Sequence, residues 1–298
     1  MKQMVTEKHA FLLQVRSIDK RTLRLMQKLD NAACDLYLHV DAKSGPFDQA
    51  AVQQSMKHSA VFFTPRGNVS WAAFSQLWAE IELLRNATQN GHYAYYHLLS
   101  ESDYPVRPIS EILSFFSGKR LEYVEFENIN APNSINRLRY YYPLQEYLGK
   151  KHGLAWAAQK FLLLLEHIFG VNRLRKNNKI RDIGKGPNWF SITDDLVRYV
   201  LSNTSEIKDT YKYCRAPDEV FIQTLILNSE FQSRLSDSSE GNMRYVVWKG
   251  GNSPVNLGPD DIADIRQSGK LFARKVGDDQ KGWALRSILD RPEQEESV

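Results

Sequence analysis

The sequence predicts an α/β protein with a mostly parallel central sheet and helices on both faces. Two observations support this prediction. Strand and helix patterns alternate over the first hundred residues, which is typical of parallel βαβ units. In addition, two short acidic motifs, Ser100–Pro105 and Ala216–Glu219, follow a predicted strand and open a predicted helix. An open α/β sheet builds its ligand crevice at such positions, so the pair indicates an enzyme site.

The first elements follow in a regular order. Helical spacing of apolar residues predicts a helix from Ile18 to Leu29, with Asp19 near its start, and a second from Trp71 to Leu84. The apolar runs between them predict strands at Phe11–Val15, Asp35–Val40, Ala60–Phe63 and Tyr93–Leu99.

Later elements are predicted by the same patterns. Helices are expected at Ile109–Phe116, 154–169 and Asp194–Leu201, and strands at Leu121–Phe126, Trp189–Thr193 and Arg244–Trp248. Neither an internal repeat nor a clear linker divides the chain, which favours one domain over residues 1–285. Residues 286–298 form an acidic tail without periodicity, and we expect it to be disordered.

Composition excludes several classes of protein. With 298 residues, 42% hydrophobic and 25% charged, the chain is typical of a globular protein. Its net charge of +4 is too small to indicate nucleic-acid binding, although a local cationic pocket can still bind a phosphorylated ligand. Cys34 and Cys214 show no metal-ligand spacing, which favours a reduced compartment. Neither a secretory signal nor a membrane span is predicted, so we expect a cytoplasmic protein.

Two segments of the sequence each allow two interpretations. The aliphatic run Phe161–Leu165 is predicted to be a buried helix face, with docking on a membrane surface as the alternative. The basic run Arg173–Lys179 is predicted to be solvated surface, with contact to an anionic ligand as the alternative.

Common catalytic motifs are absent from the sequence: no phosphate-binding loop, dinucleotide turn, zinc motif or nucleophile elbow is present. Glu101-Ser102-Asp103 resembles the Asp-x-Asp triplet that holds a divalent cation on a nucleotide sugar. A triplet of this kind at a strand end could bind Mg²⁺ or Mn²⁺, so a metal role remains open at this point.

Five segments in order resemble the signature blocks of one family: His39–Ser44, Leu98–Pro105, Gly186–Thr193, Ala216–Leu225 and Leu271–Lys275. The resemblance extends from about residue 9 to residue 276, nearly the whole chain. The family is that of the core-2/I-branching β-1,6-N-acetylglucosaminyltransferases and peptide O-xylosyltransferases.

This resemblance implies a nucleotide-diphospho-sugar transferase (GT-A) fold and an inverting transfer of a sugar to a hydroxyl. We expect N-acetylglucosamine from UDP-GlcNAc as the donor and a glycan as the acceptor. Glu219 matches the family base, which takes the acceptor proton. The positive end of a helix dipole would favour its ionised form. The alternative is that Asp218 and Glu219 merely cap the helix.

The resemblance also implies a donor site. Lys275 matches a lysine that binds the diphosphate, Arg274 could assist it, and Asp41 and Asp103 belong to the donor-binding blocks. The branching enzymes work without a metal, so we expect no cofactor, with Mg²⁺ or Mn²⁺ as the alternative. One departure is that the stretch Gly250–Val255 lacks the family's second arginine; Lys249 or Arg274 could replace it. For Asp41, a capping role is the alternative.

Trp248 matches a tryptophan that lines the acceptor sugar, and Glu125 and Arg137 lie where the family binds its acceptor. The animal relatives carry a membrane anchor and disulfides, so the chain resembles a bacterial member. We expect a polysaccharide-synthesis enzyme with a glycan or lipid-linked glycan acceptor, in the cytoplasm or at the inner face of the membrane. Two alternatives are transfer of xylose or another sugar, and a glycan- or nucleotide-sugar-binding protein without activity.

Overall fold

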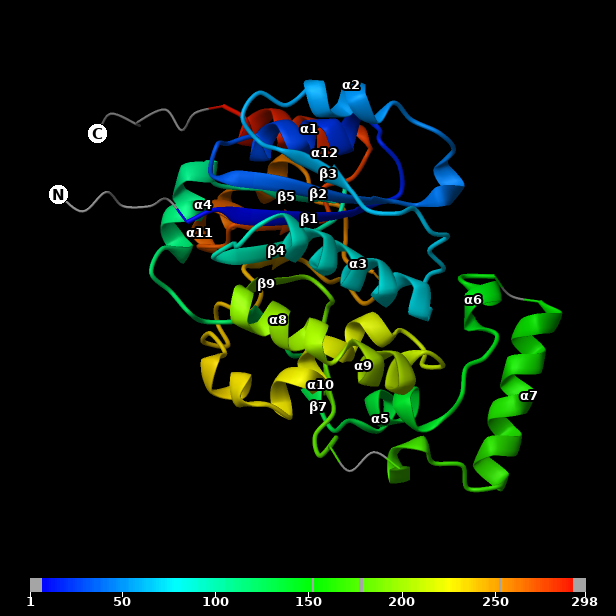
Figure 1. The fold of residues 1–298 in the computed structure, drawn as a ribbon. Helices are drawn as coiled ribbons and strands as arrows, with labels where there is room; N and C mark the ends of the chain where they lie inside the picture. Colours follow the sequence, from blue (N-terminus) through cyan, green and yellow to red (C-terminus); the bar gives the residue numbers. More distant parts are fainter. Residues whose placement is uncertain (1–6, 152, 177–178, 252, 292–298) are drawn as a thin grey trace.

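In the computed structural model, which describes residues 7–151, 153–176, 179–251 and 253–291, six strands form a central sheet in the order β3-β2-β1-β4-β9-β6 (Figure 1). The pairs among β1 to β4 are parallel, whereas β9 runs antiparallel to both of its neighbours. The predicted α/β class with a mostly parallel sheet is therefore confirmed. The strands are β1 (His9–Val15), β2 (Cys34–Val40), β3 (Val61–Phe63), β4 (Tyr95–Leu99), β6 (Tyr123–Val124) and β9 (Phe190–Thr193).

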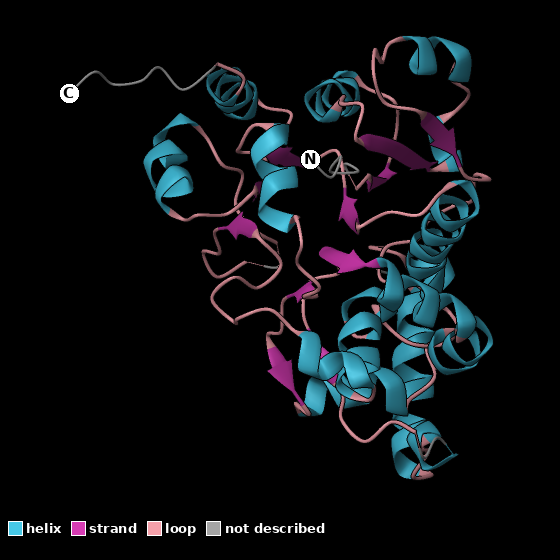
Figure 2. Ribbon diagram, turned by 60° about the vertical axis from the view of Figure 1, so that its left-hand side comes forward, coloured by secondary structure: helices cyan, strands magenta, loops and turns pink. Residues whose placement is uncertain are grey.

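Helices cover both faces of this sheet, and Figure 2 shows the same arrangement from a second direction. Successive side chains of a strand point to opposite faces. Leu13 of β1 accordingly packs in the core with Leu25 and Leu285, while the adjacent Leu12 packs in a second core with Leu84 and Leu196. These four partners lie on α1 (Lys20–Leu29), α12 (Gln280–Leu289), α3 (Phe74–Asn90) and α8 (Asp194–Ser202), respectively.

The remaining helices lie around the edges of the sheet. They are α2 (Gln49–Gln54), α4 (Ile109–Phe116), α5 (Pro132–Arg139), α6 (Gln145–Leu148), α7 (Leu154–Ile168), α9 (Thr204–Tyr211), α10 (Phe221–Leu227) and α11 (Ile262–Gln267). Short 3-10 helices are η1 (Ala42–Ser44), η2 (Arg173–Lys176), η3 (Pro217–Glu219), η4 (Glu230–Arg234) and η5 (Pro259–Asp261). Among the described residues, every helix is too short or too polar to span a bilayer.

A smaller sheet fastens the C-terminal part of the chain to the turn after β4. In this sheet β11 runs antiparallel to β5, so that Arg274 lies opposite Asp103. Two distant blocks of the sequence thus meet at the carboxyl end of β4. The strands of this smaller sheet are β10 (Arg244–Val246), β11 (Phe272–Arg274) and β5 (Asp103–Pro105). A separate two-stranded sheet consists of β7 (Asn128–Ile129) and β8 (Gly184–Lys185).

Two predicted elements are shorter than expected. The helix predicted from Trp71 begins at Phe74, because Ala72 adopts a left-handed conformation with φ of 58° that a right-handed helix cannot contain. Trp71 therefore lies in an exposed turn. The strand predicted at Leu121–Phe126 is reduced to Tyr123–Val124, and Glu122 ahead of it uses its buried carboxylate to accept hydrogen bonds from Thr193.

The predicted burial of the α7 apolar face is wrong. Among the described side chains of this helix, Gln159 alone is buried. Within the predicted run, Leu162, Leu163 and Leu165 are half-buried, and Phe161 and Leu164 are exposed. Figure 1 shows the reason: α7 lies at the periphery, away from both cores.

The C-terminal boundary predicted at residue 285 falls inside helix α12, which continues to Leu289. Its residue Arg286 is buried and donates hydrogen bonds to the carbonyls of Gly277 at 2.6 Å and Val276 at 2.9 Å. The end of the helix is therefore part of the fold. Residues 292–298 of the predicted tail lie outside the described residues.

Candidate active site

Asp41 follows β2 at the carboxyl edge of the sheet. Its carboxylate accepts a hydrogen bond from Lys43 N at 3.0 Å and forms an ion pair with Lys43 Nζ at 3.3 Å. Asp41 therefore caps the short helix η1, as the alternative interpretation expected. Contact of its carboxylate with a nucleotide stays a prediction.

Asp103 and Arg274 form a buried ion pair at the end of β4. The Asp103 side chain is fully buried, and its Oδ2 accepts from Arg274 Nη1 at 2.7 Å. The backbone N–H and the hydroxyl of Ser100 donate to the same oxygen, each at 2.7 Å. A carboxylate in such a position is stable only when paired and hydrogen-bonded, so Asp103 holds Arg274 in place.

The Arg274 guanidinium is also stacked on an aromatic ring. Its Cζ lies 4.1 Å from the centroid of Trp189, a half-buried residue just ahead of β9. Stacking on one side and pairing on the other fix a guanidinium in a single orientation. Trp189 was part of a signature block but was not predicted as a site residue.

Lys275 is half-buried beside this pair and has a second cation as a neighbour. Burial, followed by the charges of Arg274 and Lys150, lowers the pKa of Lys275, and Asp103 opposes this effect. Among the described residues, no hydrogen bond or ion pair occupies the Lys275 ammonium. The ammonium of Lys150, in the turn after α6, lies over the Trp71 ring, 5.4 Å from its centroid. The charges of Arg274 and Lys150 therefore both act on the Lys275 ammonium.

Lys249 was one predicted substitute for that arginine, and it lies exposed just beyond the end of β10. Part of the predicted stretch Gly250–Val255, Asn252, lies outside the described residues. The structure instead brings Lys150 to this site from 125 positions earlier in the chain. No sequence signal marked Lys150, because it belongs to none of the signature blocks.

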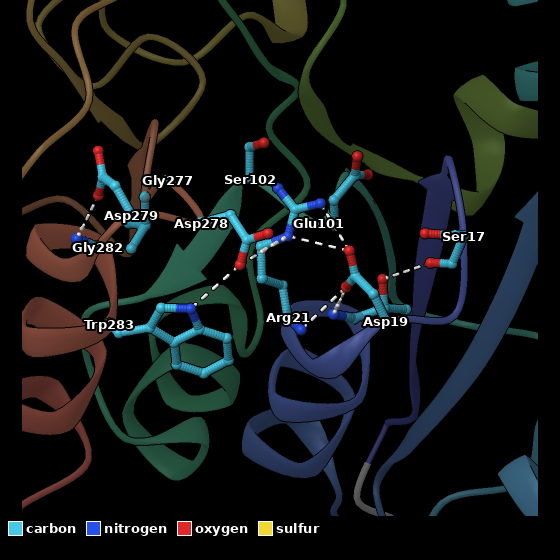
Figure 3. A network of polar contacts seen from close by, with 12 residues as sticks. Ser17, Asp19, Arg21, Glu101, Ser102, Gly277, Asp278, Asp279, Gly282 and Trp283 are labelled. Carbon is cyan, nitrogen blue, oxygen red and sulfur yellow. Dashed lines mark hydrogen bonds and ion pairs between the residues drawn. The ribbon is translucent and has the colours of Figure 1, made fainter.

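The two acids of the Glu101-Ser102-Asp103 triplet have different partners. Glu101 lies beside Arg21 and Asp19 (Figure 3), where burial raises its pKa and the charge of Arg21 opposes the shift. Arg21 itself pairs with Asp19 at 2.6 Å. Asp103, in contrast, pairs with Arg274. Among the described residues, no three His, Cys, Asp or Glu side chains gather as a metal site, and the triplet does not fit a divalent cation well.

Glu219 lies in η3 and presents its carboxylate to solvent, with 36% of the side chain exposed. Arg137 Nη1 on α5 donates to Glu219 Oε2 at 2.6 Å, and Lys185 Nζ lies 3.8 Å from the same oxygen. The predicted helix-dipole contribution needs correction, because η3 has three residues and α10 begins only at Phe221. Cationic side chains, rather than a helix terminus, neighbour this carboxylate.

Asp218 is buried and faces away from solvent. Gln76 Nε2 donates to its Oδ2 at 2.6 Å. Burial, together with the charge of Glu219, raises the pKa of Asp218 to about 7, against the effect of Arg137. Burial and the charge of Asp218 raise the pKa of Glu80 nearby. Of the two adjacent acids, Glu219 is thus the one that a substrate can reach.

The segment 186–189 connects these two parts of the site. Gly186 N donates to Glu219 O at 3.0 Å, and three residues later the Trp189 ring lies against Arg274. Three residues span at most about 10 Å, so this segment keeps Trp189 close to the backbone at Glu219. A side chain at Gly186 would place Cβ only 2.0 Å from Glu125 O, which explains glycine there.

The residues predicted to bind an acceptor do not form one cluster. Arg137 contacts Glu219 directly, as described above. Glu125 follows β6 and lies beside Gly241: a Cβ added to this glycine would be 3.7 Å from the Cγ of Glu125. Burial raises the pKa of Glu125, an effect that the charge of Lys270 opposes. Trp248 lies beyond β10 and is 55% exposed.

The site therefore has two chemically different ends. One is a solvent-facing carboxylate with an arginine partner, suited to accept a proton from a hydroxyl. The other is a group of cations, among which Arg274 is held in one orientation, suited to stabilise an anionic leaving group.

Comparison with known proteins identifies a family and several relatives of this chain. A family model described as "Core-2/I-Branching enzyme" matches residues 10–267. This match and the mostly parallel sheet confirm the predicted nucleotide-diphospho-sugar transferase (GT-A) fold and the family resemblance.

Among curated proteins, xylosyltransferase 1 of Pan troglodytes and of Homo sapiens are each 25% identical over 291 residues. Xylosyltransferase 2 of Pan troglodytes is also 25% identical. These alignments cover 89% of this chain but 28–31% of the relatives, so the chain spans less than a third of their length.

Among solved structures, the apo structure of the bifunctional glycosyltransferase WbbM aligns with a TM-score of 0.45 at 11% sequence identity. The alignment covers 97% of this chain and 50% of that chain, and the likeness is too distant to bear on function.

The buried position of Asp218 predicts a pH-dependent stability. Since its folded-state pKa of about 7 lies above the ordinary 3.8, the protein loses stability as the pH rises between these values. Asp218→Asn keeps the shape of the side chain, and because an amide does not ionise, it never places a charge at this buried position. Its melting temperature relative to wild type should therefore be more favourable at about pH 8 than at about pH 5. Asp209→Asn, an exposed change on α9, is the control. An equal difference at both pH values would contradict the prediction.

Proposed function

The chain belongs to the Core-2/I-Branching enzyme family, and from this premise we propose that it is an inverting glycosyltransferase. It transfers a sugar, N-acetylglucosamine from UDP-GlcNAc, in β linkage to a hydroxyl of a glycan acceptor. The observation that carries this proposal is that segment 186–189 links Glu219, which is partly exposed and paired with Arg137, to the cations at Arg274 and Lys275.

In the proposed reaction, Glu219 acts as the general base. Its carboxylate accepts the proton of the acceptor hydroxyl while that oxygen forms a bond to the anomeric carbon. The bond from this carbon to the diphosphate breaks at the same time, and its electron pair leaves with UDP. Arg137, at 2.6 Å from Glu219, orients the carboxylate and lies where an acceptor hydroxyl would approach.

The diphosphate is held by protein cations in this proposal, without a metal. Lys275 supplies a charge without a protein partner in the described residues, Arg274 is held in a fixed orientation by Asp103, and Lys150 adds a third charge. Fixed cations stabilise a leaving group without needing to reorganise as its charge develops. Asp41 at the end of β2 is proposed to contact the uridine or its ribose.

Trp248 and Glu125 are proposed to contact the acceptor. An exposed indole next to a sugar-binding site offers an apolar face to the apolar face of a pyranose ring. We propose that the enzyme acts in polysaccharide synthesis in the bacterial cytoplasm, at the inner face of the membrane. The acceptor is a glycan or a lipid-linked glycan.

Xylose is the second candidate for the transferred sugar. Ser102-Asp103-Tyr104-Pro105 resembles the xylosyltransferase version of its block, and xylosyltransferases are among the relatives. A panel of UDP-sugars, screened for hydrolysis, transfer and thermal stabilisation, distinguishes the two donors. Turnover of a UDP-sugar supports the proposed function; binding of nucleotide sugars without any turnover would instead indicate an inactive binding protein.

The first prediction tests the base. Glu219→Gln removes the proton acceptor and keeps the shape, so turnover should fall by about 10²–10⁴-fold. Affinity for the donor should barely change, since the carboxylate acts on the acceptor. Glu111→Gln, an exposed change on α4, is the matched control and should keep full turnover. Normal turnover in a folded Glu219→Gln protein would exclude the role.

The second prediction tests the cations. Lys275→Ala should weaken UDP binding about tenfold to a hundredfold, the usual range for a hydrogen bond to a charged group of about 1.5–3 kcal/mol. Turnover should fall with it. Lys281→Ala, an exposed change at the start of α12, should leave UDP affinity unchanged. Calorimetry that finds wild-type affinity in Lys275→Ala would argue for a metal at Glu101 and Asp103.

A further inference from the structure

Helix α7 is held to the protein by polar contacts. Gln159, its buried residue, accepts a hydrogen bond from Leu144 N at 3.1 Å and donates to Tyr141 O at 3.2 Å. Two helical turns later, the carboxylate of Glu166 accepts a hydrogen bond from Tyr141 N at 2.8 Å. The face of α7 toward the protein therefore carries an amide and a carboxylate, beside the half-buried Leu162 and Leu163.

The opposite face of α7 is apolar and open to solvent. Leu154, Phe161, Leu164 and Ile168 are 92%, 59%, 55% and 65% exposed. At about 100° per residue, all four lie within about 40° of the direction opposite Gln159. We call these four residues the α7 stripe.

This orientation is the reverse of the usual one. A surface helix normally turns its apolar residues to the core and its polar residues to water. Contiguous apolar side chains left in solvent mark an interaction surface. Figure 1 shows α7 at the edge of the molecule, away from the central sheet, so the α7 stripe is accessible to a partner.

The charge around α7 identifies the kind of partner. Residues 143–181 contain eight lysines and arginines but only two acids, Glu146 and Glu166. The rest of the chain, with 31 basic and 33 acidic residues, carries a slight negative charge. Lys151, Lys160 and Arg175 of this segment are exposed. An apolar stripe flanked by basic residues is the pattern of helices that lie in the interface of an anionic membrane.

We propose that α7 docks on an anionic lipid surface, with the α7 stripe inserted among the lipids and the flanking lysines and arginines on the headgroups. A second copy of the chain is a poorer partner, because stripe-to-stripe contact would bring two strongly basic segments together. With 15 residues, the helix would lie in the plane of the interface instead of crossing the bilayer.

The test uses the full chain and vesicles of phosphatidylcholine with or without phosphatidylglycerol. Co-sedimentation should be strong with the anionic vesicles, weaker with the neutral ones, and reduced by added salt. The triple variant Phe161→Ser, Leu164→Ser, Ile168→Ser should lower partitioning about tenfold or more. Ile129→Ser, which removes an exposed apolar side chain on β7, is the matched control and should bind like wild type.

A second variant tests the charges separately. Lys151→Glu with Lys160→Glu leaves the α7 stripe intact and should abolish the preference for anionic vesicles. Circular dichroism checks that each variant is folded, and turnover of a soluble substrate should match wild type. Vesicle binding is measured without sugar nucleotide, so its outcome is independent of the proposed transferase activity. Absence of vesicle binding by wild type, or a stripe-dependent dimer in sedimentation velocity, would overturn the proposal.

Discussion

The buried ion pair between Asp103 and Arg274 is the contact on which the candidate site depends. It joins the turn after β4 to β11, two segments that are 171 positions apart in the sequence. Trp189, from a third segment, lies against the same guanidinium. Removing one partner of such a pair typically costs about 3–5 kcal/mol, because the other charge stays buried. The pair therefore restrains the end of β11 that leads to Lys275, and segment 186–189 joins Trp189 to the backbone at Glu219.

The region around Glu219 is assembled by backbone contacts of the same kind. Ala216 and Ala72 both adopt left-handed conformations, and Ala216 N donates to Ala72 O at 2.7 Å. Helix α6 contacts the turn that contains Ala72, because Gln145 Nε2 donates a hydrogen bond to Trp71 O at 3.2 Å. Left-handed alanines are strained, and such strain is often found at functional sites. One chain of contacts thus links the turn that carries Glu219, the proposed base, with Lys150 and the segment that leads to α7.

Local patterns in the sequence predicted the strands of the central sheet and a helix start near Asp19, which caps α1. The Asp103–Arg274 pair, the contact between Arg137 and Glu219, and the arrival of Lys150 beside Lys275 could not be predicted, because each depends on long-range packing. The run at Phe161–Leu165 shows the limit most clearly. Its composition predicted a buried helix face, but burial depends on which side of the helix meets the protein, and Gln159 and Glu166 occupy that side.

The central claim is that fixed protein cations, held by the Asp103–Arg274 pair, bind the diphosphate in place of a metal ion. The most direct test is calorimetric titration of UDP into protein treated exhaustively with EDTA, repeated after Mn²⁺ or Mg²⁺ is added back, with turnover measured in parallel. We predict the same UDP affinity and the same turnover under all these conditions. Binding and activity that are lost with EDTA and restored by either ion would contradict the claim and make Glu101 and Asp103 the candidate metal ligands.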